Sequence, residues 1–581
     1  MPGFVSSRKP EEIQVARNGS QVLLDALQAR GAEYIFGIPG TLTLPVYDAM
    51  IDGAGATPIV TRHEQGAGFA ADGYAKVSGN TGVVFTVPGP GGTNLATALR
   101  SAYEDAVPLV AVTATLADNM RDRSAIHDVD MEKALAGCVK KSFTPDSVAG
   151  IAPAVEAAFR WAAAGRPGPA QVVMKANLFQ AEEERVIIAP EFEGPPPAPP
   201  VDERALDEIA ESLLAARRPV IYAGNGVVAA RCERQVQLLA SKLGAPVVTS
   251  VKGRGILSEA DPLSFGLVHF LGCEEMLEEA DLCLALGTGF GQFATFYFKA
   301  PMPKNLIQID IDPERVGRNY PASVGLVSDL KPALEGLIRR ISDAEDAALT
   351  EGHVRVREGK RRYEERLRSF STKPTEPPFH GLFVMKTLRE NTSPDTIFVS
   401  DSSATQSWLM EQAFVVHRPR SILLSEAYQS MGYAVGAAIG AKLGAPERPV
   451  CAIVGDGSFT MTCGELATAA ALDLSITYLI FNDGEYNALR HSQKHVFGER
   501  YIATSLNNPD CPALARGCGA HGHRVESAEA LGSVIRESQA GGGVHVIDCP
   551  IDRDVLSSRW TRTVKSFRGG AATAPPPDAG D

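Results

Sequence analysis

The stretch Gly455-Asp456-Gly457-Ser458 follows an apolar run at 450–454, and the stretch Asn482-Asp483-Gly484 follows a second apolar run at 476–481. Each run has the length and composition of a strand buried in a parallel sheet. The residues between them have a helical pattern at 462–470. A strand, a helix and a second strand in this order place both stretches at the carboxyl edge of one sheet, where open α/β sheets bind ligands.

The acidic residues of these two turns indicate a divalent metal bound together with phosphate. Asp456 and Asp483 stand 27 positions apart (483 − 456), and carboxylate oxygens are preferred ligands of Mg²⁺. Glycines let a diphosphate approach the backbone, and a helix N-terminus favours its negative charge. An ordinary strand–helix–strand crossover with a glycine-rich turn is the simpler alternative.

Strands and helices alternate in three blocks along the 581 residues. This alternation predicts an α/β protein with three doubly wound parallel-sheet domains. The predicted division is a flexible N-terminus at 1–17, a first domain at 18–182, a Pro-rich linker at 183–203, a Rossmann-like middle domain at 204–341, a second linker at 342–380, a third domain at 381–557, and a basic and then disordered tail at 558–581.

Composition narrows the class of protein. Acidic residues outnumber basic ones by 69 to 56, and the formal net charge of −13 argues against non-specific binding of nucleic acid. The nine cysteines show neither a metal-binding nor a disulfide pattern. The N-terminus lacks a secretory signal, and no apolar run is long enough to span a membrane. We therefore expect a cytoplasmic protein whose partners include neither nucleic acid nor membrane.

Glu64 is the candidate acid of the first domain. It follows a predicted strand at 58–60 and precedes a run of small residues at 66–71. Such a run predicts a helix with a face that packs closely on a neighbour, and Glu64 then stands partly buried at its start. Acids are favoured in the first turn of any helix, so a capping role is the alternative for this glutamate.

Four motifs in order resemble the acetolactate synthase/pyruvate decarboxylase superfamily of thiamine diphosphate (ThDP) enzymes. They are Phe36-Gly37-Ile38-Pro39-Gly40, Arg62-His63-Glu64-Gln65, Pro88-Gly89-Pro90-Gly91-Gly92-Thr93-Asn94, and the paired stretches around Asp456 and Asp483. The resemblance covers about 19–557 and implies the cofactors ThDP and Mg²⁺. It also implies that the first domain binds the aminopyrimidine ring and the third domain the diphosphate. Sites of this kind lie between subunits, so a homodimer or homotetramer is expected.

The resemblance assigns roles to individual residues. Glu64 lies against ring atom N1′ and promotes the imino tautomer that removes the proton from C2 of the cofactor. Met431 is the apolar wedge under the bent cofactor, with a plain core methionine as the alternative, and Gln429 accepts a bond from the 4′-amino group through its carbonyl. The other cofactor-binding residues implied are Pro39, Gly40, Asn94, Ser402, Ser403, Gly455, Gly457, Ser458 and Tyr486.

The implied metal ligands include one departure from the family pattern. They are Asp456, Asp483 and the backbone carbonyl of Glu485, and the family usually has asparagine where Asp483 stands. A second carboxylate is still a good ligand for a hard cation. It adds negative charge beside a diphosphate, which should alter the affinity for the metal and its pH dependence.

The middle domain raises the question of a flavin. Two of its segments, 218–227 and 306–313, resemble the family domain that holds FAD in some members and is empty in others. Flavin-binding members often carry Gly-x-Arg-Phe at the place of 285–292, where no arginine follows the glycine. FAD is therefore an alternative without support, and a structural domain is the expectation.

Residues near the predicted substrate pocket bear on the reaction. His127 stands where acetolactate synthases usually have glutamine, and an imidazole can transfer protons near neutral pH; a structural role is its alternative. The stretch 482–490 looks closer to benzoylformate decarboxylase, although Val87 replaces a histidine of that enzyme. A basic run at the chain end, Arg559, Arg562, Lys565 and Arg568, stands where acyl-CoA members close over CoA, and a solvated tail is the alternative.

The expected function is ThDP- and Mg²⁺-dependent non-oxidative decarboxylation of a 2-oxo acid, with transfer of the resulting acyl carbanion to an acceptor, as in an acetolactate synthase-like carboligase. Three alternatives stay open. The first is a simple 2-oxo acid decarboxylase that releases an aldehyde. The others are a 2-hydroxyacyl-CoA lyase and a non-catalytic ThDP-fold protein that only binds a partner.

Overall fold

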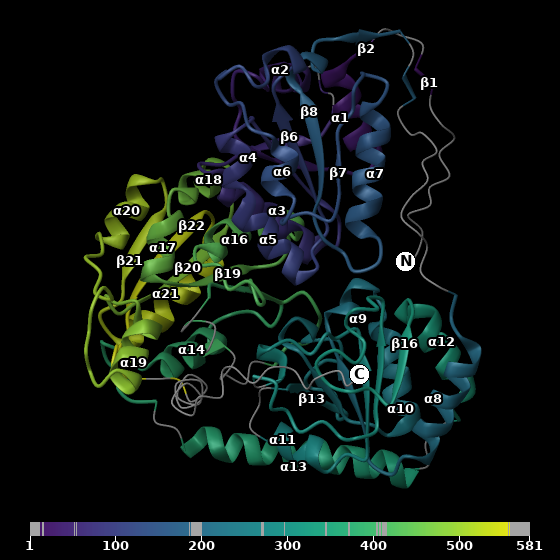
Figure 1. Ribbon diagram of the computed structural model, residues 1–581. Helices are drawn as coiled ribbons and strands as arrows, with labels where there is room; N and C mark the ends of the chain where they lie inside the picture. The colour runs from purple at the N-terminus through teal and green to yellow at the C-terminus, as the bar shows by residue number, and fades with distance from the viewer. Residues whose placement is uncertain are drawn as a thin grey trace.

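The chain folds into three α/β domains, each built on a six-stranded parallel sheet (Figure 1). This arrangement confirms the fold class predicted from the sequence. The computed structural model describes residues 12–13, 17–51, 53, 55–184, 186–187, 200–268, 272–295, 297–342, 346–369, 372–402, 405, 408–409, 415–555 and 557. Within these residues, every helix is too short or too polar to cross a membrane.

The first domain has the strand order β4-β3-β5-β6-β8-β7. The order reverses between β3 and β5, so this is the switch point of the sheet. Its strands are β3 (Tyr34–Gly37), β4 (Thr57–Val60), β5 (Gly82–Thr86), β6 (Leu109–Thr115), β7 (Ser142–Phe143) and β8 (Ala170–Lys175). Its helices are α1 (Gly19–Ala29), α2 (Leu44–Ile51), α3 (Glu64–Ser78), α4 (Pro90–Asn94), α5 (Ala96–Asp105), α6 (Met131–Leu135) and α7 (Ile151–Ala163). Residues of α1, α2 and α7 share one hydrophobic cluster, and those of α3 and α5 belong to another.

The middle domain has the strand order β13-β12-β11-β14-β15-β16. Its strands are β11 (Pro219–Ala223), β12 (Val247–Thr249), β13 (Ser264–Leu267), β14 (Leu282–Leu286), β15 (Leu306–Asp310) and β16 (Val324–Val327). Its helices are α8 (Glu203–Ala215), α9 (Asn225–Ala229), α10 (Glu233–Leu243), α11 (Cys273–Glu278) and α12 (Leu330–Arg340). At its switch point the glycine turn packs on the protein itself, because a Cβ on Gly226 would lie 2.6 Å from the Cα of Gly287. These glycines therefore have a packing role that requires no flavin.

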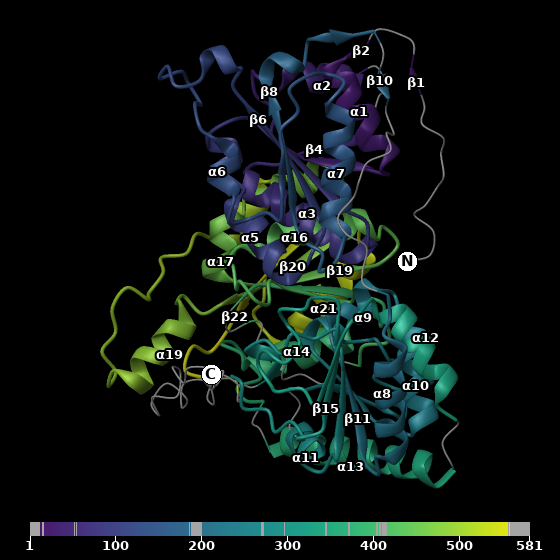
Figure 2. The same cartoon turned by 45° about the vertical axis from the view of Figure 1, so that its right-hand side comes forward.

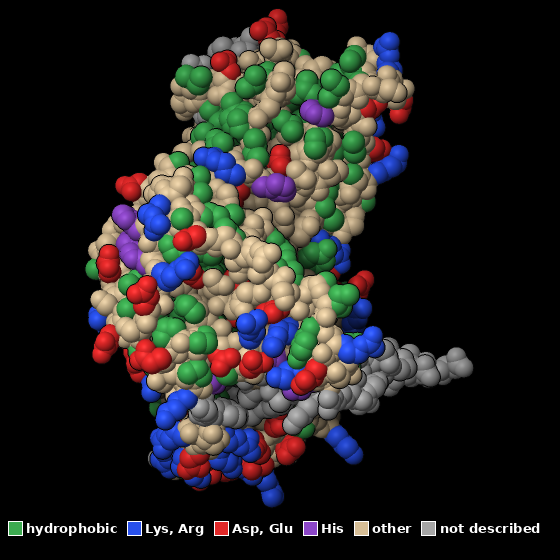
Figure 3. Space-filling view, turned by 90° about the vertical axis from the view of Figure 1, so that its left-hand side faces the viewer, with side chains coloured by type: hydrophobic (Ala, Val, Ile, Leu, Met, Phe, Trp, Pro, Cys, Tyr) green, Lys and Arg blue, Asp and Glu red, His purple; other side chains and the backbone are tan. Residues whose placement is uncertain are grey.

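The segments predicted as linkers carry more structure than expected. Helix α13 (Asp346–Ser369) occupies most of 342–380 and packs on the middle domain through Val356 and Tyr363. The many charged side chains of α13 concealed its helical pattern in the sequence. Figure 3 shows basic and acidic side chains gathered at the lower end of the molecule, the end at which α13 lies in Figure 1. At the first linker, β9 (Glu182–Glu183) and β10 (Val186–Ile187) pair with β2 (Arg17–Asn18) and β1 (Glu12–Ile13). The tail from 558 onward lies outside the described residues.

The third domain has the strand order β18-β17-β19-β20-β22-β21. Its strands are β17 (Ile397–Ser400), β18 (Ile422–Leu423), β19 (Val450–Gly455), β20 (Ile476–Asn482), β21 (His521–Arg524) and β22 (Val544–Pro550). Its helices are α14 (Gly381–Glu390), α16 (Tyr433–Gly444), α17 (Asp456–Thr462), α18 (Glu465–Ala471), α19 (Asn487–Val496), α20 (Cys511–Gly517) and α21 (Ala528–Ala540), with α19 on the outer side in Figure 2. The helix predicted at 462–470 is thus divided into α17 and α18.

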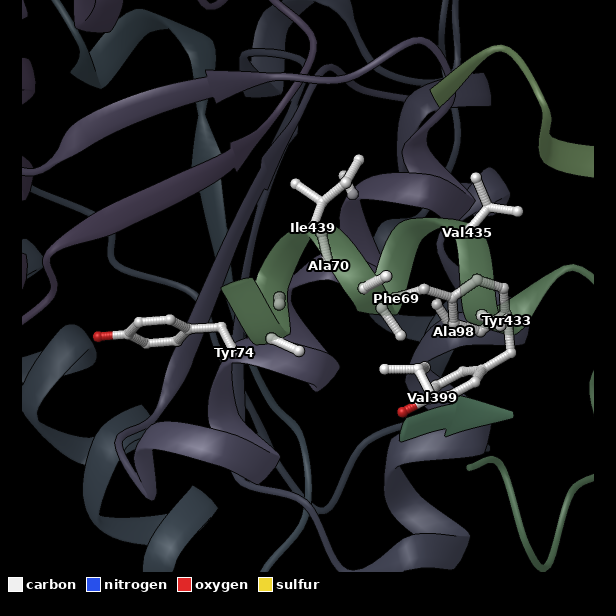
Figure 4. Close-up of a cluster of buried hydrophobic side chains, with 14 of the residues drawn as sticks. Phe69, Ala70, Tyr74, Ala98, Val399, Tyr433, Val435 and Ile439 are labelled. Carbon is white, nitrogen blue, oxygen red and sulfur yellow. The ribbon is translucent and has the colours of Figure 1, made fainter. Parts of the chain in front are cut away.

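Helices α3 and α16 join the first and third domains by direct backbone contact. The predicted small-residue face of α3 packs on α16, where a Cβ on Gly436 would lie 2.8 Å from the carbonyl oxygen of Gly66. Four positions later in both helices, Gly440 contacts Ala70. The residue numbers therefore increase in the same direction along the interface, and the two helices run parallel. Phe69 and Tyr433 pack edge to face in the cluster between them (Figure 4). The N-termini of α3 and α16 consequently lie at the same end of the interface.

Candidate active site

The carboxyl ends of three neighbouring strands bring the predicted diphosphate and metal residues together. Ser402 follows β17, Asp456 follows β19 and Asp483 follows β20. The strand order reverses between β17 and β19, so these turns surround the switch point of the third sheet. This is the edge at which the sequence predicted ligand binding.

Asp456 ties the two glycine turns to each other. Its Oδ1 accepts a bond of 2.8 Å from the backbone N–H of Gly457, and its Oδ2 accepts one of 2.8 Å from Gly484. The side-chain amide of Asn508 also donates to Oδ2, at 2.6 Å. Asn508 was not predicted from the sequence, since it lies 52 positions away (508 − 456) in a loop without a motif. The second lone pair of Oδ1 is available to a metal.

The two carboxyl groups of the predicted metal site lack a compensating cation among the contacts described. Burial raises the pKa of Asp456. Burial, and then the neighbouring charge of Asp456, raise the pKa of Asp483 to about 7. A bound divalent cation would favour the ionised form of both groups, so these residues fit the Mg²⁺ that the sequence predicts.

Glu485 is the third predicted metal ligand, through its backbone carbonyl. Oε1 of its side chain accepts bonds from the hydroxyl of Ser505 at 3.0 Å and from Arg553 at 3.1 Å, whereas the buried Oε2 has no hydrogen-bond partner in the described part of the chain. Among the described residues, no group of three or more His, Cys, Asp or Glu side chains is arranged to hold a metal. The predicted ligand set does not require one, because it consists of two carboxylates and a carbonyl.

Replacing Asp483 by asparagine should stabilise the metal-free protein at high pH. A folded-state pKa of about 7 lies above the ordinary aspartate value, so the stability that Asp483 contributes is present at acid pH and is lost as the pH rises toward 7. Asp483→Asn removes this loss. In EDTA we expect its melting temperature to exceed that of wild type by roughly 2–5 °C at about pH 8 and by less at about pH 5. Identical melting temperatures at both pH values would contradict the expectation.

The residues predicted to contact the diphosphate follow strands β17 and β19. A Cβ on Gly457 would lie 2.6 Å from the Tyr486 ring, so only glycine leaves room there. Ser458 is buried at the start of α17, for which Gly455 is the N-cap residue. Ser402 is buried as well, whereas Ser403 lies outside the described residues.

Asp401 is a site residue that the sequence did not reveal. Its Oδ1 accepts bonds from the backbone N–H groups of Ser402 at 2.9 Å and Gly432 at 3.1 Å, and its Oδ2 accepts one of 2.9 Å from Ala434. It therefore fastens the end of β17 to the start of α16. The signal available was an acid directly after a strand, as for Asp456, but its partners stand about thirty positions later and no local pattern predicts them.

The segment before α16 carries the predicted wedge. Met431 is half-buried and belongs to none of the hydrophobic clusters, which argues against a plain core methionine. Gln429 has a left-handed backbone, with φ of 55°. Its side-chain amide donates to the carbonyl of Glu426 at 2.6 Å and to that of Ser425 at 3.3 Å, which holds the turn.

Glu64 begins α3 and is held by Asn94. The Asn94 amide donates to Oε2 of Glu64 at 3.0 Å, which joins two of the motifs quoted from the sequence. The N-cap of this helix is His63, whose ring accepts the N–H of Gln65, so Glu64 itself is not the cap. Only 9% of Glu64 is exposed. Glu64 therefore lies in the first turn of α3, where acids are favoured, without being its N-cap residue.

The remaining first-domain residues converge on the switch point of the first sheet. Gly40, after β3, lies against Val87, after β5. His127 packs against Gly89, where a Cβ would lie 3.1 Å from the Cα of the histidine. His127 is therefore next to the loop that follows β5. His127 is half-buried and has a left-handed backbone, with φ of 67°. Gly40, which Pro39 precedes, thus lies on the same group of loops as His127, close to Asn94 and Glu64.

Glu64 and its neighbours belong to the first domain, whereas Asp456 and Met431 belong to the third domain. Among the described residues, no hydrogen bond or ion pair joins Glu64 to Asp456 or Met431. In addition to the contact of α3 with α16, Glu465 of α18 joins the two domains by accepting the backbone N–H groups of Arg62 at 3.0 Å and His63 at 2.9 Å. We call the first-domain group around Glu64 and the third-domain group around Asp456 the two half-sites.

Comparison with known proteins agrees with this geometry. Three family models match the chain: the N-terminal TPP binding domain of thiamine pyrophosphate enzymes at 17–135, their central domain at 206–337, and their C-terminal TPP binding domain at 401–549. These ranges correspond to the three sheets.

Relatives of similar length match over nearly the whole chain. An acetolactate synthase of Mycobacterium bovis is 32% identical, with 93% of this chain and 88% of the relative covered. A probable acetolactate synthase large subunit of Methanocaldococcus jannaschii is 32% identical over 92% of both chains. A probable 2-ketoarginine decarboxylase of Pseudomonas aeruginosa is 34% identical over 92% of this chain and 93% of its own. The chain is therefore an enzyme, and it belongs to the thiamine pyrophosphate enzyme family, among the relatives of the acetolactate synthase large subunits.

Proposed function

We propose that the protein is a ThDP- and Mg²⁺-dependent carboligase that decarboxylates a 2-oxo acid and joins the remaining acyl unit to an acceptor carbonyl compound. The observation that carries the proposal is the buried Glu64, which is held by Asn94 on one domain, together with the paired carboxyl groups of Asp456 and Asp483 on another. When bound, ThDP supplies a nucleophilic carbon and stabilises the negative charge left by loss of CO₂.

Glu64 is the side chain that acts on the aminopyrimidine ring in this proposal. Asn94 occupies Oε2, so Oε1 is the atom available to share a proton with ring atom N1′. A Cβ on Gly91 would lie 3.3 Å from Oε1, and the absence of a side chain there keeps that oxygen accessible. The carboxyl group thereby favours the tautomer needed for deprotonation of C2.

The third-domain residues bind and orient the cofactor in this proposal. Asp456, Asp483 and the carbonyl of Glu485 would hold Mg²⁺, which would neutralise the charge of the diphosphate. Gln429 accepts a hydrogen bond from the 4′-amino group through its carbonyl, and the half-buried Met431 supports the bent cofactor. The resemblance to enzymes whose sites lie between subunits supports a homodimer or homotetramer in which each site takes one half from each subunit.

The runner-up is a simple 2-oxo acid decarboxylase. The similarity to a probable 2-ketoarginine decarboxylase and the imidazole of His127 at the first switch point favour it. The acyl-CoA lyase alternative depended on the basic run at the chain end, which lies outside the described residues. The non-catalytic alternative is wrong, because the matches show an enzyme.

A product analysis separates the two leading functions. Release of CO₂ and the masses of the products are measured over a panel of 2-oxo acids, with and without an acceptor aldehyde or a second oxo acid. A carboligase gives a product whose mass is the sum of acyl unit and acceptor. Quantitative release of aldehyde in the presence of acceptor would favour the decarboxylase, and no turnover of any 2-oxo acid would overturn both.

His127 should influence the ratio of these products. If its imidazole protonates the reacting carbon, His127→Gln shifts the product from aldehyde toward carboligation, since glutamine forms hydrogen bonds but does not give up a proton. The ratio is measured for wild type and variant at matched conversion between about pH 5.5 and 8, where an ordinary imidazole titrates. If the ratio and the rate both stay unchanged, His127 has a structural role.

A further inference from the structure

A buried network of charged side chains joins all three domains behind the segment that carries Gln429 and Met431. Asp105 ends α5 in the first domain, and Lys252 follows β12 in the middle domain. Both meet the third domain at Glu426, at the start of the segment 426–432, which we call the cofactor loop. No residue of this network was singled out from the sequence.

Asp105 makes four contacts with its two carboxylate oxygens. Oδ1 accepts from the ammonium group of Lys252 at 3.0 Å and from the backbone N–H of Ala427 at 3.2 Å. Oδ2 accepts from the ammonium group of Lys76 at 3.1 Å and from the backbone N–H of Glu426 at 3.1 Å. One carboxylate of the first domain thus accepts hydrogen bonds from two successive backbone amides of the cofactor loop.

The lysines keep this buried carboxylate charged. Burial of Asp105 opposes its ionisation, but Lys252 and Lys76 outweigh it and hold the pKa of Asp105 well below its usual range. Lys252 also lies 3.5 Å from the carboxylate of Glu426. Hydrogen bonds to an ionised acceptor are stronger than neutral ones, so the charge reinforces the hold on the loop amides.

The cofactor loop is therefore fastened at both ends by buried carboxylates. Asp105 holds Glu426 and Ala427, and Asp401 holds Gly432. Between these anchors, the side chain of Gln429 returns to the carbonyl of Glu426. The position of the loop in the cofactor site consequently depends on a residue of the first domain and on the lysine of the middle domain that pairs with it.

We propose that Asp105 is the positioning residue of the cofactor loop, and that through Lys252 the middle domain contributes to the geometry of the active site. The proposal rests on the proposed role of Gln429 and Met431 in holding ThDP. The alternative is a buried ion network that has only a structural role, although such networks often yield little net stabilisation.

The test compares Asp105→Asn with wild type in two measurements. The first is amide hydrogen exchange, followed by mass spectrometry, of peptides that cover Glu426 and Ala427 in the full chain without cofactor. We expect at least tenfold faster exchange, because asparagine removes the charge and directs an NH₂ group at donors. The second is deuterium exchange at C2 of added ThDP with Mg²⁺, which we expect to slow at least tenfold.

A second variant keeps the test conclusive if Asp105→Asn does not fold. Lys252→Met leaves Asp105 paired with Lys76, so it should change both measurements in the same direction by a smaller factor. A cavity of about 160 Å³ beside the network is lined by these three residues. Water in this cavity can hydrate the groups that Lys252 leaves, so we expect this variant to fold.

Glu259→Gln is the matched control. Glu259 is a buried carboxylate that pairs with Arg254 and accepts the backbone N–H of Val416, so it also joins the middle and third domains. It lies away from the cofactor loop and should lower the melting temperature without changing either exchange rate. Unchanged exchange in Asp105→Asn, or equal changes in Glu259→Gln, would overturn the proposal. A wild-type chain that binds no ThDP would instead overturn the proposed function, because amide exchange is measured without the cofactor.

Discussion

Asp456→Ala is expected to abolish ThDP binding in the presence of Mg²⁺. The substitution removes a metal ligand, and it also removes the acceptor that Gly457, Gly484 and Asn508 share. Two backbone N–H groups are then left without a partner at the edge where the diphosphate should lie, at a cost of about 1–3 kcal/mol each where they stay buried. Isothermal titration calorimetry of ThDP with Mg²⁺ measures the loss, and wild type in EDTA should show the same loss.

Asp483→Asn is the control within the same site. It restores the residue usual in the family and keeps an oxygen ligand, so ThDP binding should survive. Unchanged affinity of Asp456→Ala, or of wild type in EDTA, would remove the metal from the proposed site. Loss of binding in Asp483→Asn would show that the second carboxylate is indispensable here.

Glu64→Gln is expected to slow exchange of the C2 proton of bound ThDP roughly a thousandfold, equivalent to about 4 kcal/mol. Glutamine preserves the shape of the side chain and an oxygen that can accept the Asn94 amide, so folding and ThDP affinity should change little. It cannot share a proton with N1′, and the reactive tautomer is therefore disfavoured. Proton magnetic resonance after mixing with D₂O measures the exchange rate, and a wild-type rate would exclude Glu64 from the mechanism.

Mixing the two inactive variants tests whether sites are shared between subunits. If Glu64 of one chain works with Asp456 of its partner, a mixed dimer of Glu64→Gln and Asp456→Ala chains has one site with both defects and one intact site. Activity should then return on mixing, after subunits exchange. If each site were complete within one chain, the mixture would stay inactive.

The sequence predicted what depends on local patterns. The strands before Asp456 and Asp483 are continuous apolar runs, so the carboxyl edge of the third sheet and its acids were predictable. The small residues after Glu64 predicted a close helix contact, although not that α16 would be the partner. Asp401 and Asp105 were missed because their partners are backbone amides from distant segments or other domains, and the periodicity of a chain carries no information about them.

Helix α13 was missed because of its composition, although its pattern is local. Its charged residues and the prolines that follow were interpreted as a linker, because few apolar residues stand out. Val356 and Tyr363 stand seven positions apart (363 − 356), which suffices to bury one stripe against the middle domain. Gly359 approaches Phe265 of that domain at the same stripe. A long helix with a narrow contact can therefore resemble a linker in composition.

The backbone contact between α3 and α16 has a mechanical consequence. Where Gly440 meets Ala70 and Gly436 meets Gly66, no side chains intervene that could change rotamer and allow the helices to slide. The first and third domains of one chain should therefore behave as a single stiff block. If ThDP is bound between two such blocks, the hinge that admits the cofactor must lie at the seam between subunits or in the loops that border it, and a mutation that loosens α3 against α16 would disturb both half-sites at once.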